Sequence, residues 1–294
     1  MKSVFLNKAI KYILLPLAAL LVLSYIVYLV LNPINTVYNV LAVTEKAKCQ
    51  IMDVANTSFN VEKVTIYDQS DSILFKDFSG NFRFYQPASI EFERISKGPL
   101  IISINNASSE PYCGIYQNET QIYKVNQSIT IVASDIEGIL SEGKSILIPI
   151  SGKVECGEDL AGQVEGILSP VLREGTVTMA GYSKMSSSYY KAGSEQLYMG
   201  DRLVFDNDTT MAIGFIQVSE EPAFKIAYRV QANNAKVLKP GPREVNSGYN
   251  INVSIYDRLL NDKFFQSISL VFAGLAVIAS IGSFIMDYLK FNDD

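Results

Sequence analysis

Two long uncharged stretches stand out in the pattern of hydrophobic and polar positions along the chain. Residues 12–44 carry no charged side chain, with the densest apolar run at 13–31, and residues 264–286 form the second uncharged stretch. At about 1.5 Å per residue, a helix over either run reaches across a hydrocarbon core roughly 30 Å thick. The pattern therefore predicts two transmembrane helices, at 12–31 and at 264–286.

The charges around these stretches give the expected orientation. Lys2, Lys8 and Lys11 precede the first span, and an excess of lysine marks the cytoplasmic side of a membrane. We therefore expect an integral protein of the plasma or inner membrane, with a cytoplasmic N-tail at 1–11 and a cytoplasmic C-tail at 287–294. Residues 44–263 would be extracytoplasmic, with a membrane-proximal segment at 32–44 and a β-rich region at 45–263.

Two helical patterns accompany the predicted spans. Apolar residues from Ile34 to Leu41 share one helical face, which predicts a short amphipathic helix after the first span. In the second span, small residues recur at intervals of four and three, a spacing that allows close packing against another helix. This helix-packing seam consists of Ser269, Ala273, Ala276, Ser280 and Ser283.

Strand patterns fill most of the region between the predicted spans. Apolar residues alternate with polar ones at 82–84, 90–92, 129–131 and 249–255, as they do in half-buried strands. Three stretches have the turn residues of hairpins: DFSGNF (77–82), YQNETQIY (116–123) and ISGKV (150–154). Helical spacing at 158–172 interrupts the strands and marks 158–175 as the expected seam between two units. The expected fold is a mainly-β extracytoplasmic domain, a sandwich or barrel-like, carried by two transmembrane α-helices.

The composition narrows the chemistry that the chain can perform. The 294 residues have a net charge of −5, and they include neither histidine nor tryptophan. Without histidine, the chain lacks the commonest general base, the Ser-His and Cys-His pairs and the usual zinc ligands. No basic block suggests nucleic acid as a partner. We expect no catalytic residue, no cofactor and no metal site.

Three cysteines, Cys49, Cys113 and Cys156, are widely spaced and form no C-x-x-C motif. In an oxidising compartment, one disulfide could form and leave one free thiol, with Cys113 and Cys156 as the candidate pair. The alternative is that all three are inert, small apolar side chains.

The Ser-x-x-Lys spacing occurs twice, at Ser141…Lys144 and at Ser188…Lys191. This spacing can pair a serine nucleophile with a lysine base on one helical turn. Neither copy falls in a predicted helix, so a Ser-Lys hydrolase is the less favoured interpretation.

The stretch LVFDNDTT (203–210) contains Asp206-x-Asp208-x-Thr210 and resembles the nucleophile motif of haloacid-dehalogenase-type phosphatases. That family needs its aspartate at the end of a parallel strand in a doubly wound sheet. Apolar residues instead alternate on both sides of this stretch, as in two antiparallel strands. We therefore expect a hairpin turn in which Asp206 and Asp208 bond to the backbone.

A longer stretch, residues 175–218, resembles the β module of FecR-type envelope proteins. The shared pattern is a Gly-x-Val strand, a Gly-Asp-x-Leu strand, a short acidic turn and a small or apolar strand. The matching positions are Gly175, Val177, Gly200, Asp201, Leu203, Asp206, Ala212 and Phe215. The family's usual Asp-Gly-Ser turn is replaced here by SEEPAF (219–224). The resemblance implies the β module and an extracytoplasmic regulatory or interaction role.

The expected function is binding rather than catalysis. The two short tails leave no room for a cytoplasmic catalytic or signalling domain. We expect a two-pass membrane protein whose β-rich domain binds a protein or envelope component, as a structural, sensory or assembly subunit that could also self-associate. One alternative is a subunit of an oligomeric ion channel with a large extracytoplasmic domain. Another is a membrane-anchored hydrolase that uses Asp206 or a Ser-Lys pair.

Overall fold

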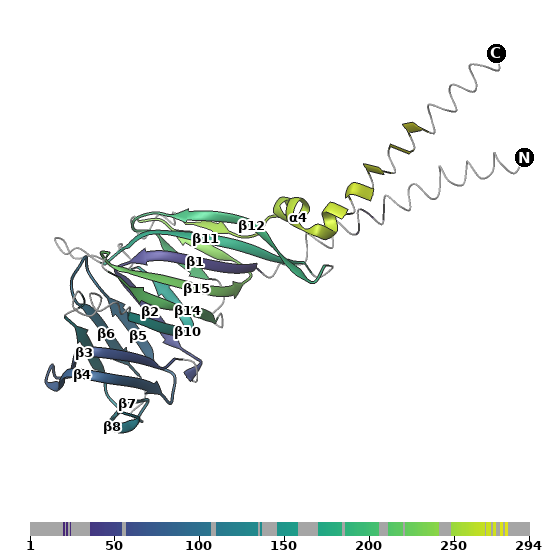
Figure 1. Cartoon of the computed structure of the whole chain (residues 1–294). Coiled ribbons are helices and arrows are strands. Elements are labelled where there is room, and N and C mark those ends of the chain that lie inside the picture. Colours follow the sequence, from purple (N-terminus) through teal and green to yellow (C-terminus); the bar gives the residue numbers. More distant parts are fainter. Residues whose placement is uncertain are drawn as a thin grey trace, which may run out of the picture. The chain divides into compact units, whose positions relative to one another are not determined.

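The computed structural model describes residues 36–54, 57–106, 110–134, 136, 146–157, 170–183, 186–205, 211–219, 221–240 and 248–267, with short pieces at 20, 22, 24, 269–271, 273–274, 277–278 and 280–281. This described part is mainly β (Figure 1). Its elements are β1 (Thr36–Thr44), β2 (Lys46–Ile51), β3 (Phe59–Tyr67), β4 (Ile73–Phe84), β5 (Ser89–Glu93), β6 (Leu100–Asn105), β7 (Cys113–Gln117), β8 (Thr120–Val125), β9 (Ile129–Ala133), β10 (Ile146–Cys156), β11 (Leu172–Ser183), β12 (Ser188–Leu197), β13 (Arg202–Phe205), β14 (Ala212–Val218), β15 (Phe224–Ala232), β16 (Ala235–Leu238), β17 (Tyr249–Ile251) and α4 (Ile255–Asn261).

The prediction of two transmembrane helices is contradicted. Among the described residues, no helix combines the length and the apolar character needed to cross a membrane. Helix α4 has 7 residues, which is about 10 Å of helix against a hydrocarbon core of roughly 30 Å. The span at 12–31 lies outside the described residues except at positions 20, 22 and 24, and the span at 264–286 is described only in pieces. The multi-pass topology, the integral-membrane location and the extracytoplasmic placement of 44–263 are contradicted with it.

The described part falls into two compact units. The larger, here called the β unit, contains Thr36–Ala180 and Lys191–Asn252, and the other includes Gly181–Tyr190 and the residues from Val253 onward. The β unit therefore holds residues on both sides of the predicted seam at 158–175. Residues 158–169, where helical spacing was found, lie outside the described residues.

Residues 36–44 form a strand, so the amphipathic helix expected at 34–41 is wrong. β1 pairs antiparallel with β15 over nine consecutive positions, which match Thr36–Thr44 to Phe224–Ala232. Three β-branched valines, Val37, Val40 and Val43, favour this extended conformation. The apolar spacing that imitates a helix comes from a strand with apolar side chains on both faces.

Fourteen strands of the described part form one sheet, in the order β12-β11-β1-β15-β14-β10-β2-β5-β6-β9-β3-β4-β7-β8 (Figure 1). A second sheet has the order β13-β16-β17. This arrangement corrects the interpretation of LVFDNDTT. β13 pairs with β16 in the small sheet, whereas β14 pairs with β10 and β15 in the large one. The strands on either side of 206–210 therefore belong to different sheets and are not hairpin partners, while 206–210 themselves lie outside the described residues.

Strand β10 joins two halves of the large sheet. Its residues Ile146–Gly152 pair with β14, and its residues Gly152–Cys156 pair with β2. Gly152 has a φ of +152°, and a Cβ there would overlap the carbonyl oxygen of Gln50. Only glycine can occupy this position. The ISGKV stretch is therefore a change of partner within one strand, and its assignment as a hairpin is wrong.

The other predicted turns have mixed outcomes. YQNETQIY is the β7–β8 hairpin, with Asn118 and Glu119 in the left-handed region at φ +48° and +62°, so this prediction is confirmed. DFSGNF lies inside β4 and is not a turn. The strand expected at 249–255 ends at Ile251, and α4 begins at Ile255 behind a capping box formed by Ser254 and Asp257.

The small sheet covers part of the inner face of the large sheet within the β unit. The rings of Tyr38 in β1 and Phe205 in β13 have centroids 5.5 Å apart, and Phe205 also contacts Tyr228 in β15 at 6.5 Å. The Tyr38 hydroxyl donates to the carbonyl oxygen of Ile251, at 2.9 Å. These contacts bury aromatic surface and satisfy the polar end of the tyrosine at the same time.

A buried arginine connects two loops of the β unit. Arg94 is 2% exposed. Its Nη1 donates to the carbonyl oxygens of Ser219 at 2.8 Å, Glu221 at 3.0 Å and Ala223 at 2.7 Å, and its Nε donates to Gly98 at 3.2 Å. Because a buried cation needs polar partners, these carbonyls fix the loop after β14 against the loop after β5.

A second buried charge, Glu45, is distant in sequence but adjacent in the fold, since the Arg94 N–H donates to the Glu45 carbonyl oxygen at 2.9 Å. The Glu45 carboxylate accepts hydrogen bonds from Arg173 Nε at 3.1 Å and from the backbone N–H groups of Ser96 and Val171, at 3.3 Å and 3.4 Å. Burial by itself raises the pKa of Glu45, but the bonds from Arg173, Ser96 and Val171 favour the ionised form more strongly. The pKa of Glu45 is therefore lowered below its usual value.

Candidate binding face

One face of the large sheet carries a row of outward-pointing apolar side chains. In the antiparallel register, Leu41 of β1 lies opposite Ala227 of β15. Ala227 lies opposite Phe215 of β14, and Phe215 lies opposite Pro149 of β10. Neighbouring strands are about 4.8 Å apart, so these four residues, here called the apolar row, extend about 14 Å across the sheet.

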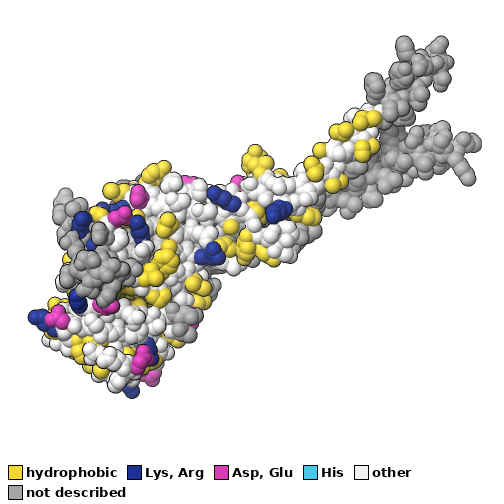
Figure 2. Space-filling model, in the orientation of Figure 1, with side chains coloured by type: hydrophobic (Ala, Val, Ile, Leu, Met, Phe, Trp, Pro, Cys, Tyr) yellow, Lys and Arg dark blue, Asp and Glu magenta, His cyan; other side chains and the backbone are white. Residues whose placement is uncertain are grey.

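The large side chains on this face are exposed. Leu41 is 57% exposed, Phe215 is 40% exposed, and Ile213, two positions before Phe215, is 68% exposed. The alternate positions Ile216 and Ile226 on the same strands are fully buried on the opposite face. Figure 2 shows exposed hydrophobic side chains among the polar surface of the strands. Since contiguous exposed apolar surface commonly marks an interaction site, this face is the strongest candidate for a binding surface.

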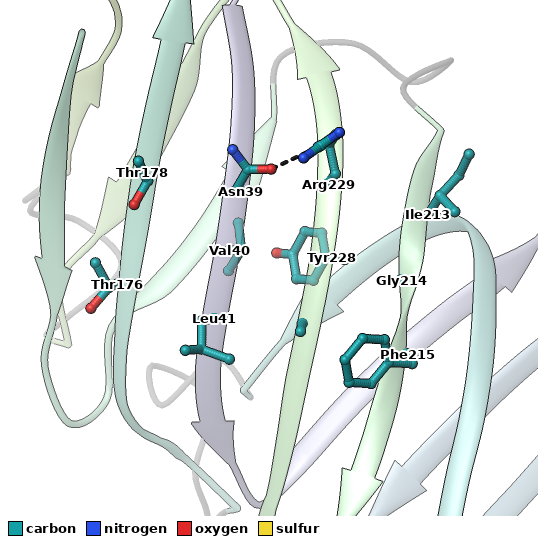
Figure 3. Close-up of a pocket in the computed structure, with 11 residues that line it drawn as sticks. Asn39, Val40, Leu41, Thr176, Thr178, Ile213, Gly214, Phe215, Tyr228 and Arg229 are labelled. Atoms are coloured by element: carbon teal, nitrogen blue, oxygen red, sulfur yellow. Dashed lines mark hydrogen bonds between the residues drawn. The ribbon is translucent and has the colours of Figure 1, made fainter. Parts of the chain in front are cut away.

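The apolar row borders a shallow hollow of about 770 Å³. Thr176 and Thr178 of β11 line one side of the hollow, and Ile213 lines the other (Figure 3). Gly214 also lines the hollow. A Cβ at this position would overlap the carbonyl oxygen of Ala227 in the next strand. The glycine therefore allows β14 and β15 to approach closely beneath the hollow.

Basic side chains flank the apolar row on both sides. Arg229 lies two positions after Ala227, and its Nε donates to Asn39 Oδ1 at 2.7 Å (Figure 3). Lys225 lies two positions before Ala227, and its Nζ is 2.8 Å from a carboxylate oxygen of Glu221. An apolar centre with basic edges is complementary to a partner segment that has an apolar stripe and acidic flanks.

The helix-packing seam predicted in the second span is only partly described. Ser269, Ala273 and Ser280 are helical and exposed, whereas Ala276 and Ser283 lie outside the described residues. Helix packing along the seam stays a prediction.

The structure places the three cysteines on separate strands as free, buried thiols. Cys113 is in β7 and Cys156 is in β10, and no disulfide joins them. Burial raises the pKa of each thiol to about 12, which keeps the sulfur protonated and unreactive. The three cysteines therefore have the properties of small apolar core residues.

The motifs considered for hydrolysis are not assembled among the described residues. Ser188 and Lys191 both lie in β12, where side chains three positions apart point to opposite faces. The Ser188 hydroxyl instead lies 2.8 Å from that of Ser186. Outside the described residues lie Ser141, Lys144, Asp206 and Asp208. Among the described residues, no cluster of three or more cysteine, aspartate or glutamate side chains is placed to hold a metal ion.

Several residues of the FecR-like pattern have a clear structural role. Gly200 has a φ of +83° in the turn between β12 and β13. The buried Asp201 carboxylate accepts a hydrogen bond from the backbone N–H of Tyr198 at 2.9 Å and from Lys239 Nζ at 2.8 Å. Leu203 is 1% exposed and packs in the core. The Gly-Asp-x-Leu motif thus forms a tight turn and anchors β13.

Sequence reasoning missed the apolar row because it lies across strands that are distant in the chain. The available signal was that β1 and β14 carry apolar residues on both faces. The spacing around Leu41 predicts the apolar face of a helix, and Ile213 and Phe215 indicate a strand, with Phe215 also a position of the FecR-like pattern. Their common surface depends on the pairing of β1 with β15 and of β15 with β14.

No protein-family model and no curated protein sequence matched the chain.

Proposed function

We propose that the β unit is a binding module that engages a partner protein through the apolar row and its basic flanks. The observation that carries this proposal is the in-register row of Leu41, Ala227, Phe215 and Pro149, with Leu41 and Phe215 exposed. The chain would act as a structural, sensory or assembly subunit and not as an enzyme.

The chemistry of the face favours a protein segment over a small polar ligand. The hollow is open and shallow, and its largest exposed groups are aliphatic and aromatic rather than hydrogen-bonding. Interfaces of this kind gain most of their affinity from a few central apolar anchors surrounded by a polar rim. Arg229 and Lys225 would form that rim and would select partners with acidic residues.

Photo-crosslinking from inside the face tests the proposal. A photoreactive phenylalanine analogue replaces Phe215 in the full chain, and a second variant carries it at Ile73, which is 58% exposed on β4. We expect crosslinks to one partner protein from position 215 and not from position 73. If the two positions give the same products, or if neither gives a specific product, the proposal is wrong.

Affinity measurements with the purified partner then separate specific docking from non-specific hydrophobic association. Replacing Phe215 by serine removes a central apolar anchor, and we expect the loss of about 2 kcal/mol, or roughly 30-fold in Kd. The matched change Ile73→Ser should leave Kd within a factor of two. Higher ionic strength should weaken binding through its effect on Arg229 and Lys225.

A further inference from the structure

A second hollow in the β unit lies between strands that approach each other without pairing. Its volume is about 470 Å³, and its apolar lining includes Phe59 and Val61 of β3, Leu100 and Ile102 of β6, Ala133 of β9 and Pro149 of β10. It is separate from the hollow beside the apolar row, since the residues lining the two hollows do not overlap.

The strand pairing explains why this hollow exists. β3 pairs with β4 from Phe59 to Tyr67, but with β9 only over Thr65–Tyr67. β10 pairs with β14 from Ile146 to Gly152, but with β2 only from Gly152 onward. In the described ladders, the early part of β3 and the early part of β10 therefore each have a strand neighbour on one side only. The second hollow lies between these two edges.

Pro149 is well suited to this position. A proline has no backbone N–H, so it is tolerated at a strand edge that makes no ladder bonds. Two positions further along β10, the backbone oxygen of Ser151 accepts a hydrogen bond from the Met52 N–H at 3.2 Å, so the backbone polar groups of Ser151 and, by alternation, of Pro149 point away from β14. The missing N–H of Pro149 thus faces the hollow and makes its wall less polar.

The buried side chains of the lining favour an apolar occupant. Phe59, Leu100 and Ile102 are each at most 2% exposed, and their side chains offer no hydrogen bond to water. A space with such walls is poorly hydrated and gains from filling by hydrocarbon. Its volume falls within the range of roughly 300–1,000 Å³ that is typical of small-molecule sites.

The mouth of the hollow has a different character. Leu147 is 52% exposed there, and the amides of Asn60 and Asn81 lie close by, joined by a hydrogen bond of 2.7 Å from Asn81 Nδ2 to Asn60 Oδ1. An amide that already donates and accepts can still bind a hydroxyl through its remaining lone pairs and hydrogens. The exposed side chains of Ser58 and Glu62 also line the hollow. The site therefore combines buried apolar walls with an exposed polar edge.

We propose that this hollow binds a single-chain aliphatic amphiphile, with its hydrocarbon tail between β3 and β10 and an uncharged, hydrogen-bonding head at Asn60 and Asn81. This activity goes beyond the proposed docking face, with which the hollow shares Pro149. The ligand class follows from buried apolar walls beside exposed hydrogen-bonding side chains, a division that matches a hydrocarbon tail and a polar head.

The absence of tryptophan from the chain makes a direct optical test possible. Leu147→Trp places a single tryptophan at the mouth of the hollow, and Ile213→Trp places one on the separate docking face. Titration of the full-length Leu147→Trp variant with 1-decanol should shift its emission to the blue and saturate. The Ile213→Trp variant should show no saturable shift. 1-Butanol should bind at least a hundredfold more weakly, because fewer buried methylene groups contribute.

A filling substitution tests the location of the site. Ala133 is 3% exposed and lines the hollow, so Ala133→Leu in the Leu147→Trp background should occupy the tail's space and weaken decanol binding at least tenfold. Ala227→Leu, the same substitution on the docking face, should leave decanol binding unchanged. Calorimetric titration of the unmodified chain with decanol provides a measurement that needs no variant. Absence of saturable binding to the unmodified chain, or equal binding by the Ala133→Leu and Ala227→Leu variants, would overturn the proposal.

Discussion

Arg94 offers the sharpest test of how the β unit is held together. Its guanidinium is 2% exposed and donates to four carbonyl oxygens, those of Gly98, Ser219, Glu221 and Ala223. Arg94→Met keeps much of the side-chain volume but removes every donor. The bond to Ala223 is buried and the other three are partly buried. Losing each of these charge-assisted bonds costs about 1 kcal/mol, so we expect a loss of about 4 kcal/mol in the free energy of unfolding. That is a large share of the roughly 5–15 kcal/mol that stabilises a typical domain.

Urea unfolding, followed by circular dichroism and tyrosine fluorescence, measures this loss. Arg94→Lys keeps a cation but loses the Nε bond and the planar fork, so its loss should be about half as large. The matched control is Arg229→Met, since Arg229 lies on the exposed docking face and its change should stay within about 0.5 kcal/mol. If Arg94→Met costs less than 1 kcal/mol, the carbonyls find other partners and the reasoning fails.

Three further predictions concern the described part of the chain. Because the pKa of Glu45 is lowered in the folded state, its contribution to the free energy of unfolding is fully present above the unfolded-state pKa of about 4.3. This contribution is lost as the pH falls through the folded-state pKa. Urea unfolding between neutral and acidic pH should therefore show a flatter pH dependence of stability for Glu45→Gln than for the wild type. Burial of the three cysteines, with each thiol pKa at about 12, predicts very slow reaction with a thiol reagent in the native state and reaction of all three in urea; fast native reaction at any of them would contradict the buried placement. Glu119 has a φ of +62° in the β7–β8 turn, a backbone conformation that glycine adopts more easily. Glu119→Gly should therefore stabilise the protein by about 0.5 kcal/mol in thermal unfolding, after allowing for the loss of the exposed ion pair with Arg83. Destabilisation would show that this ion pair contributes more than the relief of backbone strain.

Local patterns predicted the parts of the fold that depend on near neighbours. The β7–β8 hairpin could be located from Asn118-Glu119 between two alternating stretches, because two-residue turns need residues that tolerate a left-handed backbone. The mainly-β character of the described part also follows from alternation along the chain. By contrast, ISGKV and DFSGNF have similar turn residues but lie inside β10 and β4, since glycine also serves at bulges and at changes of strand partner.

Apolar runs were a weaker guide. Uncharged stretches predicted two membrane spans, and among the described residues no helix meets the requirement. The same kind of error placed β1 in a helix, because a strand with apolar side chains on both faces reproduces helical spacing over eight or nine residues. Composition and hydropathy record how apolar a segment is, but they do not record which partner covers it.

The sequence by itself determined the strand-rich character of the β unit, the hairpin turn within YQNETQIY (116–123), and the absence of histidine chemistry. The tertiary structure alone decided that the strands flanking 206–210 belong to different sheets, that Arg94 is a buried anchor, and that Leu41, Ala227, Phe215 and Pro149 share one outward face. The reason is physical: turn conformation and alternation depend on residues a few positions apart, whereas the binding face and both hollows depend on the register between strands up to nearly two hundred residues apart.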